Sequence, residues 1–196
     1  MNMAQDDLTE FFDALIFDCD GTLVDSMPTH YVAWTETLDR YGIAFPEERF
    51  YALGGVPATE IITLLAAEAG VRVNAEQLAA ERNTRYEGLH KDTMGVEPVI
   101  AIARRHRGLL PMAVASGSCL SNVEQALTEL GIAGWFDVIV AAEDVRKGKP
   151  APDVFLTAAS RLAVNASRCC AFEDTDLGMQ AIKRAGMTGV DIRRLI

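Results

Sequence analysis

Two aspartates separated by one residue, Asp18 and Asp20, directly follow a short apolar run that is typical of a buried β-strand. Side chains at positions i and i+2 of an extended chain point to the same side, so the two carboxylates can converge on one ligand. Two negative charges this close together require a cation or a shared proton. A calcium EF-hand does not fit, because its loop follows a helix and has glycine at position six, whereas Gly21 is at position four here.

Three further polar clusters follow the first one along the chain, and two of them also stand after apolar runs. They are the segment Ser116-Gly117-Ser118, the lysines Lys147 and Lys149, and the acidic pair Glu173 and Asp174. Each cluster alone is a weak signal, since such residues also occur in solvated turns and helix caps. Their order along the chain predicts one site that binds an anion with the help of a cation.

Short apolar runs predict the strands that position these clusters. They cover residues 14–17, 112–115, 138–141, 169–172 and 188–190. After the second run, a helical pattern lies between each neighbouring pair, and the patterns at 120–130 and 177–185 end at Gly131 and Gly186. Ser121 with Glu124 predicts a capping box for the first of these helices. Alternating strands and helices are typical of a parallel sheet, whose carboxyl edge binds ligands.

A gap of about 95 residues between the first two strands is too long for one crossover helix. Apolar spacing within it predicts helices at 28–41 and 58–69 and from Asn74, as the N-cap, to about His90. We therefore expect an α/β fold: a Rossmann-like, doubly wound parallel sheet core at 1–26 and 93–196. A small all-helical cap at 27–92 is inserted after the first strand.

The four clusters resemble the motifs of the haloacid dehalogenase superfamily of phosphotransferases. The first motif reads DxDGT and matches 18–22, the second ends a strand in Ser or Thr, the third is a lysine, and the fourth is an acidic pair. The resemblance covers nearly the whole chain, including the position of the helical cap. Within the superfamily, the chain is most similar to the branch of β-phosphoglucomutases and fructose-1-phosphatase-type sugar-phosphate phosphatases.

The resemblance implies roles for the residues of the core. Asp18 would be the nucleophile that forms an aspartyl-phosphate, and Asp20 would protonate the leaving oxygen and later deprotonate water. Lys149, favoured over Lys147 because it precedes Pro150, would neutralise the phosphoryl oxygens. Ser116 and the backbone amides of two neighbours would bind phosphate; these neighbours are Gly117 and Ser118.

The resemblance also implies a Mg²⁺ ion, which prefers oxygen ligands. The expected ligands are the Asp18 carboxylate, the Asp20 backbone carbonyl, and the acidic pair Glu173 and Asp174. Asp174 is favoured for direct contact, with Glu173 as the close alternative. Asp176 is either a supporting group near the metal or a helix cap.

The cap is expected to select the substrate, a small phosphorylated sugar. His30, Gly55, Arg82 and Asn83 occupy positions that resemble those facing the sugar in this branch. The alternative for His30 and Arg82 is an ordinary position on the surface of an amphipathic helix.

The cap's glycine loop favours a phosphatase over a sugar phosphomutase. The mutases of this branch hold the second phosphate of a bisphosphate with a basic residue after this loop, where Ala58 and Glu60 stand here. Arg82 is an alternative grip, so the mutase stays the second hypothesis. A receiver-type signalling module is disfavoured by the motif order and the insert, and a haloalkanoic-acid dehalogenase by the acid at Asp20.

Composition limits the partners and the compartment. The 28 acidic and 18 basic residues give a net charge of −10, which disfavours nucleic acid and anionic membranes as partners. The acidic N-terminus does not resemble a secretory signal, and the four cysteines lack metal or redox spacing. We expect a cytoplasmic monomer with buried or half-buried free thiols.

Overall fold

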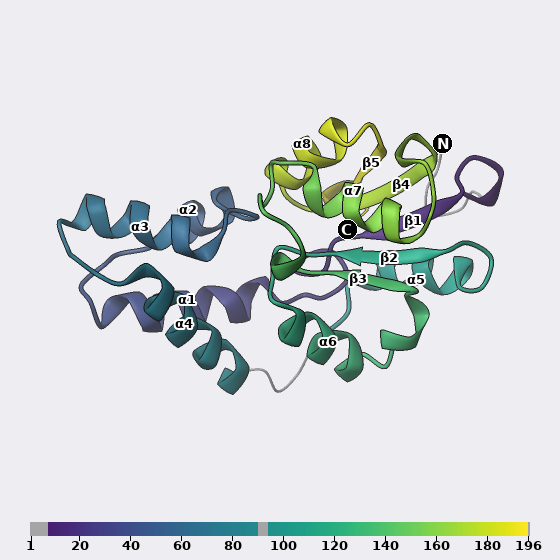
Figure 1. Ribbon diagram of the computed structural model, residues 1–196. Coiled ribbons are helices and arrows are strands. Elements are labelled where there is room, and N and C mark those ends of the chain that lie inside the picture. The colour runs from purple at the N-terminus through teal and green to yellow at the C-terminus, as the bar shows by residue number, and fades with distance from the viewer. Residues whose placement is uncertain (1–7, 90–93, 196) are drawn as a thin grey trace.

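A five-stranded parallel sheet forms the larger part of the protein (Figure 1). The computed structural model describes residues 8–89 and 94–195. The strands are β1 (Ala14–Phe17), β2 (Met112–Ala115), β3 (Val138–Val140), β4 (Cys169–Glu173) and β5 (Thr188–Asp191), in the order β3-β2-β1-β4-β5. The central strand β1 is completely buried and pairs with β2 on one side and β4 on the other. The carboxyl ends of three polar-tipped strands therefore lie side by side, as the sequence predicts.

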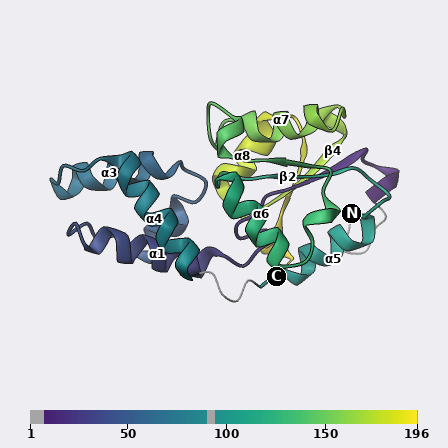
Figure 2. The same ribbon diagram turned by 60° about the horizontal axis from the view of Figure 1, so that its bottom comes forward.

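Helices cover both faces of the sheet, which is the doubly wound arrangement. They are α5 (Glu97–His106) and α6 (Leu120–Glu129) on one face, and α7 (Asp153–Arg161) and α8 (Asp176–Arg184) on the other. Figure 2 shows α7 above the sheet and α5 and α6 below it. Each face has its own apolar core, because buried strands present aliphatic side chains to both sides.

Four helices between β1 and α5 form a separate unit beyond the carboxyl edge of the sheet (Figures 1 and 2). They are α1 (Met27–Asp39), α2 (Glu47–Ala52), α3 (Ala58–Ala69) and α4 (Ala75–Leu89). Helix α4 packs on α1 and α3 around a third apolar cluster that includes Trp34 and Phe50. The helical cap is thus present where the sequence predicts it.

The two connections between the cap and the sheet unit lie next to each other. Val24 bridges Gly95 in antiparallel fashion, and the N–H of Asp25 donates to the carbonyl of Met94 at 2.8 Å. The N–H of Val96 donates to the carbonyl of Leu23 at 3.0 Å. The predicted domain limit between 92 and 93, like the predicted helix end at His90, lies outside the described residues. The division into 1–26 with 93–196 and 27–92 stays a prediction.

Most predicted elements are confirmed to within two residues at their ends. Asn74 caps α4 by accepting the N–H of Gln77 at 3.1 Å. The capping box was wrong: Cys119 is the N-cap of α6 and makes no side-chain cap bond, so Ser121 already lies inside the helix. The cysteines are free, with Cys119 half-buried and the others buried. None of the helices described is long and apolar enough to cross a membrane.

Candidate active site

Asp18 and Lys149 form the centre of the site. Asp18 follows β1 and is 4% exposed, and its Oδ1 accepts a hydrogen bond from Lys149 Nζ at 2.6 Å. The same ammonium donates to Glu173 Oε2 at 2.5 Å. Burial lowers the pKa of Lys149, but the two carboxylates more than reverse this, so the lysine stays charged. The exposed Lys147 is not part of this cluster, which agrees with the choice of Lys149.

An excess of buried negative charge surrounds Asp18. Burial, followed by repulsion from Glu173, raises the pKa of Asp18 well above its usual value despite Lys149. The same two causes raise the pKa of Asp174 to about 7, although Thr22 Oγ1 donates to its Oδ1 at 2.8 Å. One lysine does not balance three carboxylates, so the cluster has room for a further cation.

The three carboxylates fit a divalent cation. Asp18, Glu173 and Asp174 each offer one oxygen, and these oxygens lie within 4.8 Å of one another. An all-oxygen donor set suits a hard ion such as Mg²⁺. Gly21 is needed here, since it has a φ of +84° and a Cβ at this position would lie 2.3 Å from Asp174 Oδ2.

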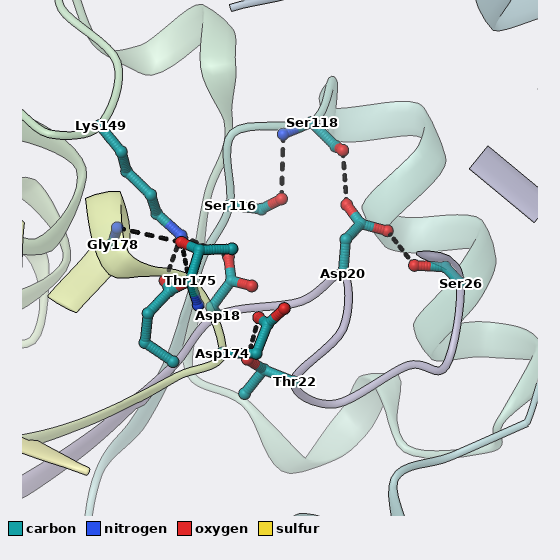
Figure 3. A network of polar contacts seen from close by, with 11 residues as sticks. Asp18, Asp20, Thr22, Ser26, Ser116, Ser118, Lys149, Asp174, Thr175 and Gly178 are labelled. Carbon is teal, nitrogen blue, oxygen red and sulfur yellow. Dashed lines mark hydrogen bonds and ion pairs between the residues drawn. The ribbon is translucent and has the colours of Figure 1, made fainter. Parts of the chain in front are cut away.

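Asp20 points away from Asp18 in Figure 3, toward Ser26 and Ser118. Ser26 Oγ donates to its Oδ1 at 2.6 Å, His30 Nε2 lies 2.9 Å from the same oxygen, and Ser118 Oγ donates to Oδ2 at 2.5 Å. Burial raises the pKa of Asp20, but His30 and the two hydroxyls lower it further, so the net pKa lies below the usual value. Asp20 is a carboxylate in this arrangement.

The cap contributes a buried chain of polar contacts to Asp20. His30, on α1, is 3% exposed and stacks on Tyr86 with 3.9 Å between the ring centroids. Arg82 Nη2 lies 2.8 Å from His30 Nδ1, and Arg82 Nη1 donates to Asn83 Oδ1 at 2.7 Å. Because a guanidinium can only donate, His30 Nδ1 must accept, and the ring proton sits on Nε2, facing Asp20. The alternative of an ordinary surface position for His30 does not hold, since the side chain is buried and lines the cavity.

The predicted phosphate-binding segment begins at the end of β2. Ser116 is 1% exposed, and its Oγ accepts the N–H of Ser118 at 3.0 Å. The Ser118 amide is therefore already used inside the segment, and the Ser116 hydroxyl proton stays available as a donor. Gly117 is exposed and presents its backbone to the same space.

One cavity of about 270 Å³ lies between the cap and the sheet edge. Asp174 is the one residue predicted for the site that does not line this cavity. The walls of the cavity include every other residue predicted for the site: Asp18, Asp20, His30, Gly55, Arg82, Asn83, Ser116, Gly117, Ser118, Lys149 and Glu173. Apolar cap side chains such as Trp34 and Phe50 complete the wall. The volume suits a molecule the size of a monosaccharide phosphate.

Sequence reasoning missed three hydroxyl residues that hold the acidic groups. Thr22 donates to Asp174, Ser26 to Asp20, and Thr175 Oγ1 to Glu173 Oε1 at 2.6 Å. All three are close to an acidic residue in the sequence, which was the available signal. Asp176 neither caps α8, whose N-cap is Thr175, nor belongs to the carboxylate cluster; it pairs with Arg193 on the surface.

Comparison with known proteins agrees with this geometry. The profile of a hydrolase family, the haloacid dehalogenase-like hydrolases, matches residues 12–186. The chain is 38% identical to fructose-1-phosphate phosphatase YqaB of Escherichia coli (strain K12), covering 95% of this chain and 99% of that protein. It is 32% identical to β-phosphoglucomutase of Bacillus subtilis (strain 168), covering 91% of this chain and 82% of that protein.

Solved structures show the same architecture. The crystal structure of β-phosphoglucomutase from Clostridium difficile superimposes with a TM-score of 0.80 at 26% identity, covering 94% of this chain and 87% of that one. The cap and the sheet unit are both included in a match of this extent.

Proposed function

Since the chain belongs to the haloacid dehalogenase-like hydrolase family and is a phosphatase, we propose that it hydrolyses the monophosphate of a small sugar through a phosphorylated Asp18. The observation that carries this proposal is the pair of Asp18 and Lys149 in a cavity that is lined by both the cap and the sheet edge. A buried carboxylate beside a charged lysine suits attack on phosphorus, because the lysine offsets the charge of the phosphoryl oxygens.

The reaction proceeds in two balanced steps. Asp18 attacks phosphorus, the bond to the sugar oxygen breaks, and the leaving oxygen takes a proton from Asp20. Water then attacks the phosphorus of the aspartyl-phosphate and gives a proton to Asp20. The bond between phosphorus and the Asp18 oxygen breaks, so that phosphate and the free Asp18 carboxylate are released. The proton of the first step requires that Asp20 leaves its donors Ser26, His30 and Ser118, because they favour its ionised form.

Asp18 and Asp174, with the backbone carbonyl of Asp20, are the proposed holders of Mg²⁺. When bound, the ion supplies positive charge against the transferring phosphoryl group. Glu173 is assigned to Lys149 instead, because one of its oxygens accepts the lysine and the other accepts Thr175. These contacts support Asp174, rather than Glu173, as the proposed direct ligand.

The side chains of Arg82 and Asn83 are the proposed hydrogen-bond partners of the sugar hydroxyl groups. Both line the cavity from α4, opposite the serines at the end of β2. The guanidinium is held over Trp34, with 5.0 Å between Arg82 Cζ and the ring centroid. The bonds of its two terminal nitrogens to His30 and Asn83 hold the guanidinium in place, so it is not free to turn toward a second phosphate, while each nitrogen keeps a second N–H for a sugar hydroxyl.

The lining therefore supports the phosphatase over the mutase. Ala58 and Thr59 face the cavity where a second phosphate would need a cation. A bisphosphate intermediate without such a grip dissociates, and water completes the reaction. We retain the cytoplasm as the proposed compartment and a monomer as the proposed form of this acidic protein.

The test is phosphate release from a panel of hexose and pentose monophosphates, with Mg²⁺ and with excess chelator. We expect release from one or more of them that requires Mg²⁺. p-Nitrophenyl phosphate serves as the general substrate and a phosphoserine peptide as the control that is too large for the closed cavity. Equal release with chelator, or hydrolysis of the peptide but of no sugar phosphate, would contradict the proposal.

A further inference from the structure

The carboxylate of Glu173 is held from two sides. Lys149 Nζ donates to Oε2 at 2.5 Å, and both hydrogen bonds to Oε1 come from Thr175, its N–H at 3.0 Å and its hydroxyl at 2.6 Å. Glu173 itself is completely buried, so water does not compete for these positions. The orientation of this carboxylate therefore depends on Thr175.

Thr175 is fixed in turn by the first turn of α8. Its Oγ1 accepts the N–H of Gly178 at 3.0 Å, so the one hydroxyl donates to the carboxylate while it accepts from the helix. Figure 3 shows this contact between Gly178 and Thr175 as a dashed line. A two-sided hydroxyl has its proton direction defined, which orients the bond to Glu173.

Gly178 is the part of the helix that makes room for Glu173. A Cβ at position 178 would lie 2.0 Å from Glu173 Cδ, which is closer than two non-bonded carbon atoms can approach. Glycine is a poorer helix former than alanine, and Gly178 lies in the first turn of α8. Its presence in α8 is explained by the carboxylate that packs against it.

We infer that Thr175 is a positioning residue that locks Glu173 and thereby keeps Lys149 on Asp18. The ammonium is shared between two carboxylates, at 2.6 Å from Asp18 and 2.5 Å from Glu173. If Glu173 turns, the shared lysine follows it or loses one partner, and the charge that faces the phosphoryl group moves. The catalytic consequence rests on the proposed function, whereas the lock itself is a property of the folded protein.

Two substitutions distinguish the role of the Thr175 hydroxyl from that of its methyl group. Its methyl group faces the cap, since a Cβ at Gly54 would lie 3.0 Å from Thr175 Cγ2. Thr175→Val keeps this methyl and removes the hydroxyl, whereas Thr175→Ser keeps the hydroxyl and removes the methyl. A role in seating the cap would make Ser the damaging variant, and the lock makes Val the damaging one.

The experiment compares both variants with the wild type in two assays. Hydrolysis of p-nitrophenyl phosphate with Mg²⁺ gives kcat and KM, and ¹⁵N-lysine NMR of the metal-free protein reports the hydrogen-bonded ammonium of Lys149. For Val we expect kcat to fall roughly ten- to a hundredfold, the scale for a catalytic group displaced by about 1 Å, with KM nearly unchanged. We also expect the Lys149 signal to broaden or vanish. Ser restores both readouts.

Asn74→Ala is the matched control for loss of a helix N-cap, because Asn74 caps α4 away from the site. We expect it to lower stability without changing kcat or the lysine signal. Thr175→Val with wild-type kcat and an unchanged lysine signal would overturn the inference, as would a Ser variant as impaired as Val.

Gly178→Ala keeps the inference testable if Thr175→Val does not fold. Alanine favours the helix, so any loss arises from the displaced Glu173 carboxylate. We expect the same fall in kcat and the same change in the lysine signal, and a normal result for both overturns the lock. If the wild type hydrolyses no phosphate ester, the proposed function fails while the NMR comparison still decides whether Thr175 holds Lys149.

Discussion

Asp18 is buried beside the ammonium of Lys149, and its carboxylate is the proposed nucleophile. An amide at this position keeps the shape of the side chain but is a poor nucleophile toward phosphorus. We expect Asp18→Asn to show no phosphate release above background in a steady-state assay with p-nitrophenyl phosphate. Asp13→Asn is the matched control, because Asp13 pairs with Arg168 on the surface, and its activity should equal that of the wild type. Turnover by Asp18→Asn beyond what deamidation supplies would exclude the covalent route.

If Asp20 is the general acid, the loss of kcat on removing its carboxyl group depends on how much the leaving group needs a proton. Asp20→Asn removes the proton donor, and we expect kcat on a sugar phosphate to fall by roughly two to four orders of magnitude. The loss should be much smaller for p-nitrophenyl phosphate, whose leaving group barely needs a proton. Parallel kinetics on both substrates check this, and an equal loss on both would remove the acid role.

Asp174 links metal binding to pH. Its pKa in the metal-free protein is raised to about 7, so the folded chain binds more protons than the unfolded chain between about pH 4 and pH 7. The metal-free protein should therefore lose stability as pH rises through this window. Mg²⁺ replaces the proton, so thermal unfolding scans should show a larger Mg²⁺-induced rise in Tm at pH 8 than at pH 5.

Asp174→Asn is the control for this behaviour, since the amide can still accept from Thr22. We expect this variant to be the more stable of the two at pH 8 without metal and to show little response to Mg²⁺. A Mg²⁺ effect that is the same at both pH values, or that survives in the variant, would argue against Asp174 as a ligand.

The residues that carry charge were predictable from the sequence, and the hydroxyls that hold them were not. Asp18, Lys149 and Asp174 stand in motifs whose types and order point to phosphoryl transfer. Thr22 and Asp174 are 152 positions apart, and their contact depends on the strand order. A serine or threonine beside an acid is too common in sequences to indicate such a contact before the fold is known.

The elements were predicted unevenly: the sequence analysis named neither helix α2 nor helix α5, although the other elements agree closely with the expected limits. Strand β1 and helix α3 (Ala58–Ala69) agree with the expected limits, because four consecutive apolar residues and a regular helical stripe leave little choice. Helix α2 has six residues and an acidic first turn, too short for a period to show. The cap of α6 was misplaced because Cys119, which carries no capping side-chain bond, takes the position where a serine is usual.

Helix α5 carries a buried histidine that ties down the start of the described chain. His106 is 1% exposed; its Nδ1 donates to the carbonyl of Ile102 at 2.9 Å, and its Nε2 accepts the N–H of Leu8 at 3.2 Å. We expect His106→Leu to lower the free energy of unfolding by about 1–3 kcal/mol, since the Leu8 N–H is left unpaired. Denaturant unfolding measures this change.

Activity at low temperature should be unchanged in His106→Leu, because the residue lies far from the cavity lining. His106→Gln, which keeps an acceptor, is the matched comparison and should recover part of the stability. Equal stability of the Leu variant and the wild type would show that the Leu8 bond contributes little.

At the scale of the whole molecule, we expect the cap wall of the cavity to determine whether a bisphosphorylated intermediate is retained. Ala58→Arg adds a cation to the cavity wall at the first turn of α3, and a desolvated Arg–phosphate pair is among the stronger charge-assisted contacts. We expect a lower inhibition constant for glucose 1,6-bisphosphate, with salt dependence, and little change for monophosphates. Ala58→Gln controls for size. An equal fall in the inhibition constant for Ala58→Gln would show that the charge of the arginine is not the cause.

The wild type gives the companion result. β-Glucose 1-phosphate incubated with catalytic bisphosphate should yield free phosphate and essentially no glucose 6-phosphate. Isomerisation faster than hydrolysis would favour the mutase and make Arg82 the first candidate for the second phosphate grip.

The paired connections between the cap and the sheet have a consequence for how such a protein diversifies. The chain leaves the sheet unit at Asp25 and returns at Met94 within one backbone hydrogen bond of 2.8 Å. A turn of a few residues would span this gap, and the charged residues at the centre of the site lie outside the helical insert: Asp18, Lys149, Glu173 and Asp174. We therefore expect that the insert can be exchanged without altering this centre. Replacing the insert would change the shape of the chamber over the reacting phosphate while the chemistry beneath is inherited unaltered.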